Sequence, residues 1–435
     1  NLIPIALLLG AFPLQAQWTT ARLSEARLQP QVVVAGTKAL FAAGKTDNGK
    51  GSARVDIYDA NTGSWAVHDL PNPSRNPNPD FTVISHSSMV FVVDRNDMSG
   101  EISIYHSADN SWKSARLSEP RMSVSVGVAG DYVVFAGGAL SPEVFSRTVD
   151  LYNVKTNAWR SIQLSEPRTG IAIAGLGEQI FLAGGDKAGE KSDVVDVLYT
   201  NVWRQSTRTL SEKRTRIEAI VTGNQVLFAG GEGPDGFNSS KVDVYDGGFN
   251  TWGSSTMTLQ GNAENLYSAV VGNKAYFLGD ENRSLLDVYD AAYSTWDIVP
   301  IPVQHAASSF AYAGDKLFLA DFSGSVEVYD CVSGIWDTLG NLSVPRSGLS
   351  GVAVGNKLLF AGGYCCSGNT DIVDIYTGIG NNVSPVQPMT LLPPYPNPAH
   401  TRVFVPLPPD ATFLRLFNSD GCLEQSQSVD NMEQI

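Results

Sequence analysis

The chain has 435 residues, with 44 acidic and 30 basic side chains and a net charge of -14. An acidic chain without a basic stripe repels a phosphate backbone, so we expect no nucleic acid partner. Four cysteines in a chain of this length are too few for a disulfide framework.

Residues 1–16 form the first recognisable segment, which we expect to be a signal peptide. The run from residue 2 to residue 12 is apolar and too short to span a bilayer, and Leu-Gln-Ala precedes Gln17. We therefore expect export, a mature chain that begins near Gln17, and no transmembrane helix in that mature chain. The alternative is an apolar edge strand.

Residues 17–380 contain a repeat that is marked by tryptophan. A period of about 40 to 50 residues is typical of arrays whose units bury their apolar faces against one another. The tryptophans are Trp18, Trp65, Trp112, Trp159, Trp203, Trp252, Trp296 and Trp336. Their spacing predicts one module repeated eight times.

Each unit is expected to form four short antiparallel strands. In six units an alternating strand that ends in tyrosine, such as Val-Asp-Leu-Tyr at 149–152, comes seven residues before the tryptophan. A more apolar strand such as 133–136 precedes it, and in four units that strand ends in a glycine pair, which lets another backbone approach closely. The first strand is joined to the second by a Gly-Asn or Gly-Asp turn, because these residues tolerate positive φ.

The unit around residues 195–199 departs from this register. Trp203 follows Tyr199 by only four residues. Either its turn is shortened or Leu198 takes the tyrosine position.

Four-stranded units of this length that are arranged radially make a β-propeller. The last tyrosine strand, at 373–376, has Val383 where its tryptophan should be, whereas Trp18 has no tyrosine strand before it. The two defects complement each other. We therefore predict an all-β fold of eight four-stranded blades, closed by the N-terminal strand.

The glycine pair, the Val-Asp-Val-Tyr-like strand and the tryptophan seven residues later resemble the kelch family over residues 17–380. Kelch-like propellers more often have six or seven blades, so seven blades is the alternative. The pattern is degraded where Asp94, Asp280 and Asp321 stand at or near glycine positions. The resemblance also implies two enzyme types as rivals, copper radical oxidases and sugar mutarotases.

The C-terminal part is expected to be separate from the propeller. Residues 381–394 are a linker rich in Pro and Asn, and residues 395–435 contain two alternating stretches, a partial β-sandwich-like module. Its opening Tyr-Pro-Asn-Pro-Ala looks like the C-terminal sorting domain of type IX secretion substrates in Gram-negative bacteria, here truncated. That resemblance implies the outer-membrane secretion machinery as a partner, with release or anchoring at the cell surface. An ordinary linker with a stub is the alternative.

The most regular polar side chain is an arginine nine residues before the glycine of the first turn, as with Arg121 and Gly130. The five arginines are Arg27, Arg121, Arg168, Arg214 and Arg346. His305 stands at the corresponding place of the seventh unit, and Pro77 and Ala263 stand at those of the second and sixth. These positions should lie on the face that also carries the long loops at 139–148, 186–193, 232–241 and 364–371.

A guanidinium group suits bidentate capture of an anion, so the five arginines and His305 are candidate ligand-binding residues at one mouth of the channel. A glutamate precedes four of the arginines by two residues. These glutamates are Glu25, Glu119, Glu166 and Glu212. We therefore favour the alternative that the arginines pin loops through local ion pairs and carbonyl contacts.

No catalytic constellation is evident, and the five histidines lack the spacing of metal ligands, so we expect no metal and no cofactor. The repeated tryptophans and tyrosines are expected between the blades, as buried core. Cys331 and Cys365 should lie on opposite faces, while Cys365 and Cys366 could close a vicinal ring or stay reduced.

These features favour a secreted or cell-surface binding protein that presents propeller loops to an extracellular protein or glycan, which could be anionic. One alternative is a carbohydrate-active enzyme of the mutarotase or oxidase type. The other is an extracellular adhesive or structural component. The fold alone does not choose among them.

Overall fold

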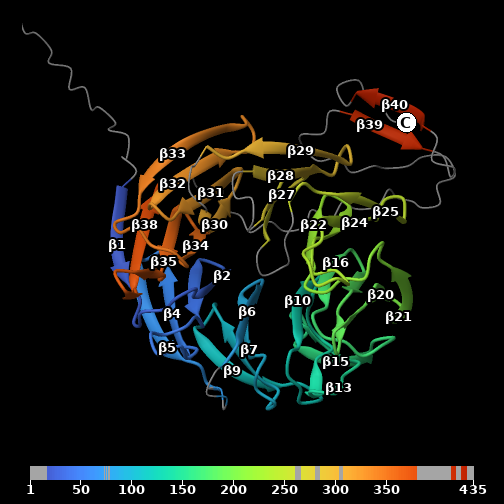
Figure 1. Ribbon diagram of the computed structural model, residues 1–435, viewed down its shortest axis with the longest axis horizontal. Coiled ribbons are helices and arrows are strands. Elements are labelled where there is room, and N and C mark those ends of the chain that lie inside the picture. The colour runs from blue at the N-terminus through green and yellow to red at the C-terminus, as the bar shows by residue number, and fades with distance from the viewer. Residues whose placement is uncertain are drawn as a thin grey trace, which may run out of the picture.

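The computed structural model describes residues 17–379, except 73, 75, 77–78, 260–265, 280–284 and 303–306, together with strands at 413–417 and 423–428. The propeller is a closed ring of eight four-stranded antiparallel sheets (Figure 1). The expected signal peptide, the linker and most of the C-terminal module lie outside the described residues. In the described part, no helix is long and apolar enough to cross a membrane.

Each blade contributes its first strand to the centre of the ring and its fourth strand to the rim. Blade 1 consists of β2 (Gln31–Ala35), β3 (Lys38–Ala42), β4 (Arg54–Asp59) and β5 (Ser64–Asp69), and blade 2 of β6 (Phe81–His86), β7 (Met89–Asp94), β8 (Glu101–His106) and β9 (Ser111–Arg116). Blade 3 consists of β10 (Ser125–Ala129), β11 (Tyr132–Ala136), β14 (Thr148–Asn153) and β15 (Ala158–Gln163), and blade 4 of β16 (Ala172–Leu176), β17 (Gln179–Ala183), β20 (Val194–Tyr199) and β21 (Arg204–Thr209).

The remaining strands complete the ring and its loops. Blade 5 consists of β22 (Glu218–Thr222), β23 (Gln225–Ala229), β24 (Lys241–Asp246) and β25 (Thr251–Thr256), and blade 6 of β26 (Tyr267–Val271), β27 (Lys274–Leu278), β28 (Leu285–Asp290) and β29 (Thr295–Pro300). Blade 7 consists of β30 (Ala307–Ala313), β31 (Lys316–Asp321), β32 (Ser325–Asp330) and β33 (Ile335–Asn341), and blade 8 of β34 (Ser350–Val354), β35 (Lys357–Ala361), β38 (Ile372–Thr377) and β1 (Gln17–Arg22). Short hairpins are formed by β12 (Ala139–Ser141) with β13 (Val144–Phe145), β18 (Asp186–Lys187) with β19 (Glu190–Lys191), and β36 (Tyr364–Cys365) with β37 (Gly368–Asn369); β39 (Phe413–Phe417) pairs with β40 (Leu423–Ser428).

The hydrophobic core lies between neighbouring blades, in eight clusters around the ring. Between blades 8 and 1, for example, Ile375 packs with Phe41 and Tyr58, and Trp65 covers this cluster from the rim. Six tyrosines of the repeat are buried and Tyr376 is half-buried, and each packs at a tilt or edge-on against the tryptophan of its own blade. Most tryptophans are half-buried, and Trp203 contacts Tyr132 of blade 3 instead. The predicted core role of these aromatic side chains is confirmed, although Trp159 is 38% exposed.

The glycine pairs bring adjacent blades into backbone contact, as predicted. Gly137 has a φ of 57°, and a Cβ at this position would lie 2.0 Å from the carbonyl oxygen of Arg168 in the next blade. The amide of Gly138 donates to the same carbonyl at 3.1 Å. A side chain at residue 137 would therefore push blades 3 and 4 apart.

The ring is closed by β1, which pairs with β38 from the other end of the propeller (Figure 1). Trp18 lies opposite Tyr376 in this pairing, just as Trp159 lies opposite Tyr152 within blade 3. The indole of Trp18 packs on Tyr376 with ring centroids 5.1 Å apart. Eight blades and N-terminal closure are confirmed, and the seven-bladed alternative is wrong.

Blade 4 has Leu198, and not Tyr199, at the tyrosine position. Leu198 pairs with Gln205, so Gln205 stands where other blades have tryptophan. Trp203 lies in the preceding turn with a φ of 50°, and the guanidinium of Arg160 lies 3.6 Å from its ring centroid. The turn is therefore not shortened, because β20 and β21 pair in the same register as β14 and β15 of blade 3, with leucine in place of tyrosine.

Candidate functional site

The propeller has two faces that differ in their loops. We call upper face the side formed by the loops between second and third strands and by the links that enter each first strand. We call lower face the opposite side, formed by the turns between first and second strands and between third and fourth strands. The candidate arginines lie in the links of the upper face.

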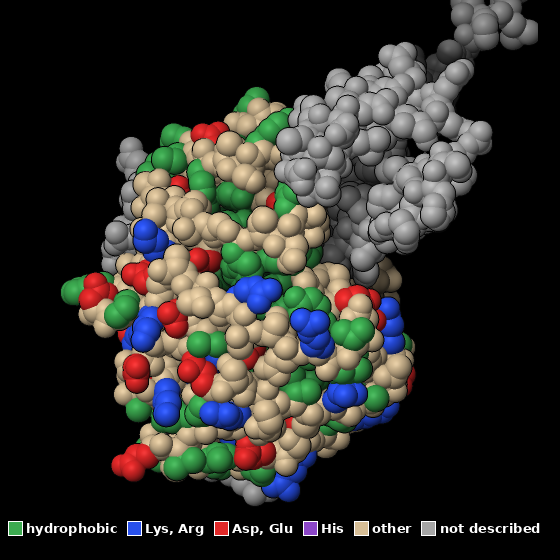
Figure 2. Space-filling view, turned by 90° about the vertical axis from the view of Figure 1, so that its right-hand side faces the viewer, with side chains coloured by type: hydrophobic (Ala, Val, Ile, Leu, Met, Phe, Trp, Pro, Cys, Tyr) green, Lys and Arg blue, Asp and Glu red, His purple; other side chains and the backbone are tan. Residues whose placement is uncertain are grey.

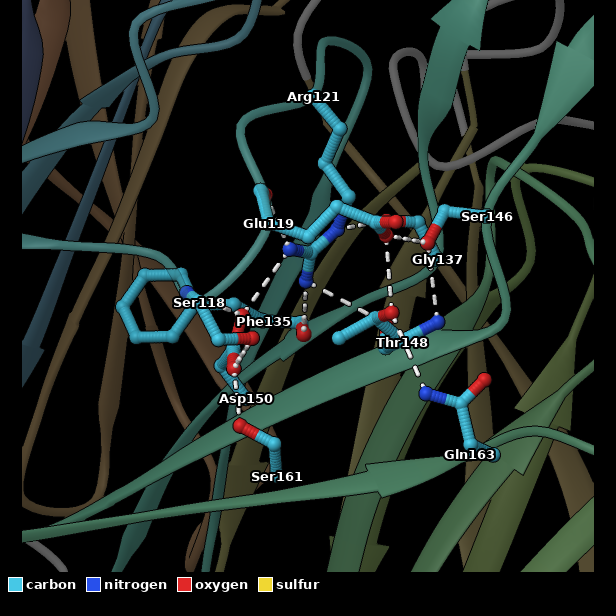
Figure 3. A network of polar contacts seen from close by, with 10 residues as sticks. All are labelled: Ser118, Glu119, Arg121, Phe135, Gly137, Ser146, Thr148, Asp150, Ser161 and Gln163. Carbon is cyan, nitrogen blue, oxygen red and sulfur yellow. Dashed lines mark hydrogen bonds and ion pairs between the residues drawn. The ribbon is translucent and has the colours of Figure 1, made fainter.

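Arg121 shows how each arginine is bound (Figure 3). Its side chain is 1% exposed and makes an ion pair with Asp150 of β14 at 3.0 Å. Its nitrogens also donate to the carbonyl oxygens of Gly137 at 2.6 Å and Phe135 at 3.1 Å, at the end of β11. The guanidinium therefore joins the second and third strands of its own blade beneath their connecting loop.

The other four arginines repeat this arrangement in their own blades. The ion pairs are Arg27 with Asp56, Arg168 with Asp196 at 2.8 Å, Arg214 with Asp243, and Arg346 with Asp374 at 2.7 Å. Burial lowers the pKa of Arg27 and Arg214, and the adjacent carboxylates act against that shift. The arginines are not brought together at one mouth, since each is enclosed in a separate blade.

The glutamates that precede the arginines bind chiefly to the loops. Glu119 accepts hydrogen bonds from the hydroxyls of Ser146 at 2.5 Å and Thr148 at 2.8 Å, where the loop enters β14 (Figure 3). Corresponding serines lie against the other three glutamates. Each glutamate therefore holds the far end of the loop, while the arginine holds its near end.

The arginine–aspartate pair of this clamp occurs in the five blades whose second-to-third-strand loops are long, and the glutamate accompanies it in four of them. Blades 2 and 7 lack it and use a short turn that is capped by one aspartate. Asp94 accepts from the amides of Asp80 and Asn96, both at 2.9 Å, and Asp321 accepts from those of Ser323 and Ser325, also at 2.9 Å. The arginines therefore hold loops through an ion pair and carbonyl contacts within their own blades, in line with the favoured alternative. Their contact with an anionic ligand stays a prediction. His305 lies outside the described residues.

The long loops are also fixed to one another across blades. Between blades 8 and 1, the amide of Asn369 donates to Asp47 at 2.8 Å. Between blades 4 and 5, Lys191 makes an ion pair with Glu232 at 2.7 Å. These contacts join neighbouring loops at two places on the upper face, where Phe237 is 73% exposed and Val144 and Tyr364 are also exposed.

Charged side chains are mixed over the side of the ring that carries blades 4 and 5. Figure 2 shows Lys and Arg side chains interspersed with Asp and Glu there, without a region of one sign. The negative net charge is therefore not concentrated on this side.

Glu218 is a polar group that the sequence pattern did not single out. It begins β22, the innermost strand of blade 5, and its carboxylate accepts from Ser268 of blade 6 at 2.6 Å. Burial raises the pKa of this carboxyl group to about 7.

Glu218 is expected to make the stability of the ring depend on pH. Because its pKa in the folded state, about 7, lies above the ordinary 4.5, the folded chain holds a proton that the unfolded chain has lost. Its contribution to stability is complete below about pH 4.5 and is lost as the pH rises through 7. Glu218→Gln should therefore gain in melting temperature relative to wild type between pH 5 and 7, by about 1–2 °C for each ~1 kcal/mol in a propeller of this size.

The control for this measurement is Glu143→Gln, because Glu143 is exposed. Its difference from wild type should stay flat over the same pH range. A Glu218→Gln difference that does not change with pH would show that this carboxyl group has an ordinary pKa.

The fold also shows where the described cysteines lie. Cys331, Cys365 and Cys366 are free, with Cys331 on the lower face and the other two in the upper-face loop of blade 8, on opposite faces as predicted. Among the residues that the structure describes, no group of three or more His, Cys, Asp or Glu side chains could hold a metal ion. No family model matches this sequence.

Proposed function

We propose that the protein is a secreted or cell-surface binding protein whose upper-face loops contact an extracellular protein or glycan. The observation that carries this proposal is Phe237, which is exposed at a loop whose base is clamped by Arg214 and Asp243. An aromatic side chain on a rigid loop supplies contact area at little entropic cost, and such residues dominate binding energy at interfaces. Tyr364 and Val144 are likewise exposed in the upper-face loops of blades 8 and 3.

The sequence outside the described propeller residues supports export. The apolar run in residues 1–16 supports passage through the inner membrane, and the sorting-domain resemblance of residues 395–435 supports contact with the outer-membrane secretion machinery. The kelch-like repeat supports a role in which a constant frame carries variable loops. In this proposal the arginines hold the loops that make contact.

The state of the arginines favours binding over catalysis. A mutarotase-like site at the channel mouth would need Arg, Glu or His side chains that reach a substrate, and an oxidase-like site would need a Tyr–Cys pair with histidines around copper. Arg121 and its four counterparts are instead paired with aspartates inside their blades. An adhesive or structural role remains compatible with the same loops and differs in lacking a discrete ligand.

A binding screen with the full chain on glycan and extracellular-protein arrays tests the proposal. Phe237→Ser and Tyr364→Ser should each weaken binding to any ligand found by about tenfold or more, ~1.4 kcal/mol, because they remove exposed contact residues without touching the core. The matched control is Val67→Ser, since Val67 is an exposed apolar residue on rim strand β5. Equal binding by all three variants would contradict a role for the upper face.

A further inference from the structure

In blade 4 an aromatic side chain stands at the end of the third strand, where five other blades have an Asp or Asn that caps the turn. In blade 5 that residue is Asp246, whose carboxylate accepts from the amides of Gly248 and Phe249 at 2.8 and 3.1 Å. In blade 4 the equivalent residue is Tyr199, because Leu198 has taken the tyrosine position. A phenol ring cannot cap the turn in this way, so Tyr199 is available for another contact.

A cavity of about 410 Å³ lies at this point, on the lower face between blades 4 and 5. Its volume is within the range of small-molecule sites. Its lining includes Tyr199, Asn201, Asn224, Gln179 and Glu178. Leu176 and Tyr245 add apolar surface to it.

The corresponding place between blades 5 and 6 is filled by a polar network. There, Gln225 donates to Asp246 at 2.8 Å and to Ser294 at 3.2 Å, and it accepts from the hydroxyl of Tyr289 at 2.9 Å. Gln179 is the equivalent of Gln225 in blade 4, since each begins the second strand. The same position in the repeat is thus closed in one blade pair and open in the next.

The open position leaves several polar groups available to a ligand. Within the described part of the chain, the side chains of Gln179, Tyr199, Asn201 and Asn224 make no hydrogen bond to the protein. Amide groups donate and accept side by side, which matches adjacent hydroxyl groups. No lysine or arginine lines the cavity, and Glu178 adds a carboxylate, so an anion is disfavoured.

Apolar side chains line the cavity beside these amides, namely Leu176, Tyr199 and Tyr245. Exposed Val202 and Phe249 follow and precede lining residues in the two turns but do not themselves line the cavity. A sugar ring has hydroxyl groups at its edge and apolar C–H groups on its faces. We propose that this cavity is a binding site for a neutral saccharide, separate from the upper-face loops.

Saturation-transfer NMR of the full chain with maltose, cellobiose, lactose and N,N′-diacetylchitobiose tests this inference. The double variant Asn201→Ala/Asn224→Ala should bind the responding disaccharide at least tenfold more weakly than wild type. Tyr199→Asp should do the same, since it restores the residue type of blade 5 and lets Gln179 close the cavity. Asn61→Ala is the matched control, because Asn61 is exposed in the equivalent turn of blade 1.

The outcomes separate this site from the proposed function. Loss of binding in the cavity variants, with unchanged melting and full binding by Asn61→Ala, supports the saccharide site. Unchanged binding in the cavity variants, or no response to any of the four disaccharides, overturns it. Binding that is lost in Phe237→Ser and kept in the cavity variants overturns it as well, and assigns the saccharide to the upper face.

Discussion

Asp150→Ala is expected to lower the free energy of unfolding by about 3–5 kcal/mol, because it leaves the buried Arg121 charge without a partner. Asp150 is almost fully buried and also accepts from the hydroxyls of Ser118 at 2.5 Å and Ser161 at 2.6 Å (Figure 3). Its loss therefore frees the link that enters blade 3 as well as the arginine. Urea-induced unfolding, followed by tryptophan fluorescence, measures this change.

Two further variants make the result specific to burial. Asp131→Ala removes an exposed partner of Lys155, an ion pair at 2.9 Å, and should cost at most about 1 kcal/mol. Arg121→Met/Asp150→Leu replaces both charges by apolar groups and should recover much of the stability lost in Asp150→Ala. A cost below about 1 kcal/mol for Asp150→Ala would mean that solvent reaches the guanidinium, and the clamp would then not hold the loop.

The blade count could be predicted because the two ends of the repeat have complementary defects. Trp18 lacks a tyrosine strand and the strand at 373–376 lacks a tryptophan, and a closed ring requires each to supply what the other lacks. The structure pairs Trp18 with Tyr376 accordingly. Because closure depends only on how the two ends of the array match, the repeat pattern was sufficient to predict the number of blades.

The ionic partner of each arginine is distant in the sequence, so the nearby glutamate does not predict it. The aspartate lies 28 or 29 residues after the arginine, in the tyrosine strand. A signal was present in one direction: every unit with the arginine has aspartate there. The second and seventh units have Ser103 and Glu327 and lack the arginine, while the sixth unit keeps Asp287 with Ala263 at the arginine position. An arginine that occurs only in units with this aspartate is expected to contact it.

The cavity between blades 4 and 5 could not be predicted to the same degree. The displaced tyrosine, with Leu198 at its usual position, was visible in the sequence. Whether the space beside Tyr199 stays open depends on which side chains of the next blade reach it, and Gln179 and Gln225 are identical residues in the two settings. Such packing between blades is fixed by three-dimensional neighbours and not by the period of the repeat.

Trp18→Ala is expected to destabilise the ring by about 3 kcal/mol, more than Trp65→Ala, its counterpart in blade 1. Trp65 belongs to a strand that a short turn ties to β4, so the loss of its side chain leaves the blade covalently connected. In contrast, β1 and β38 come from opposite ends of the propeller sequence, and side-chain and ladder contacts alone hold them together. Hydrogen exchange of the β38 amides should therefore accelerate more than tenfold in Trp18→Ala and change little in Trp65→Ala, because only the first variant lets the ring open. Equal protection of β38 in the two variants would mean that the backbone ladder closes the ring without the indole, whose packing on Tyr376 would then contribute only local stability.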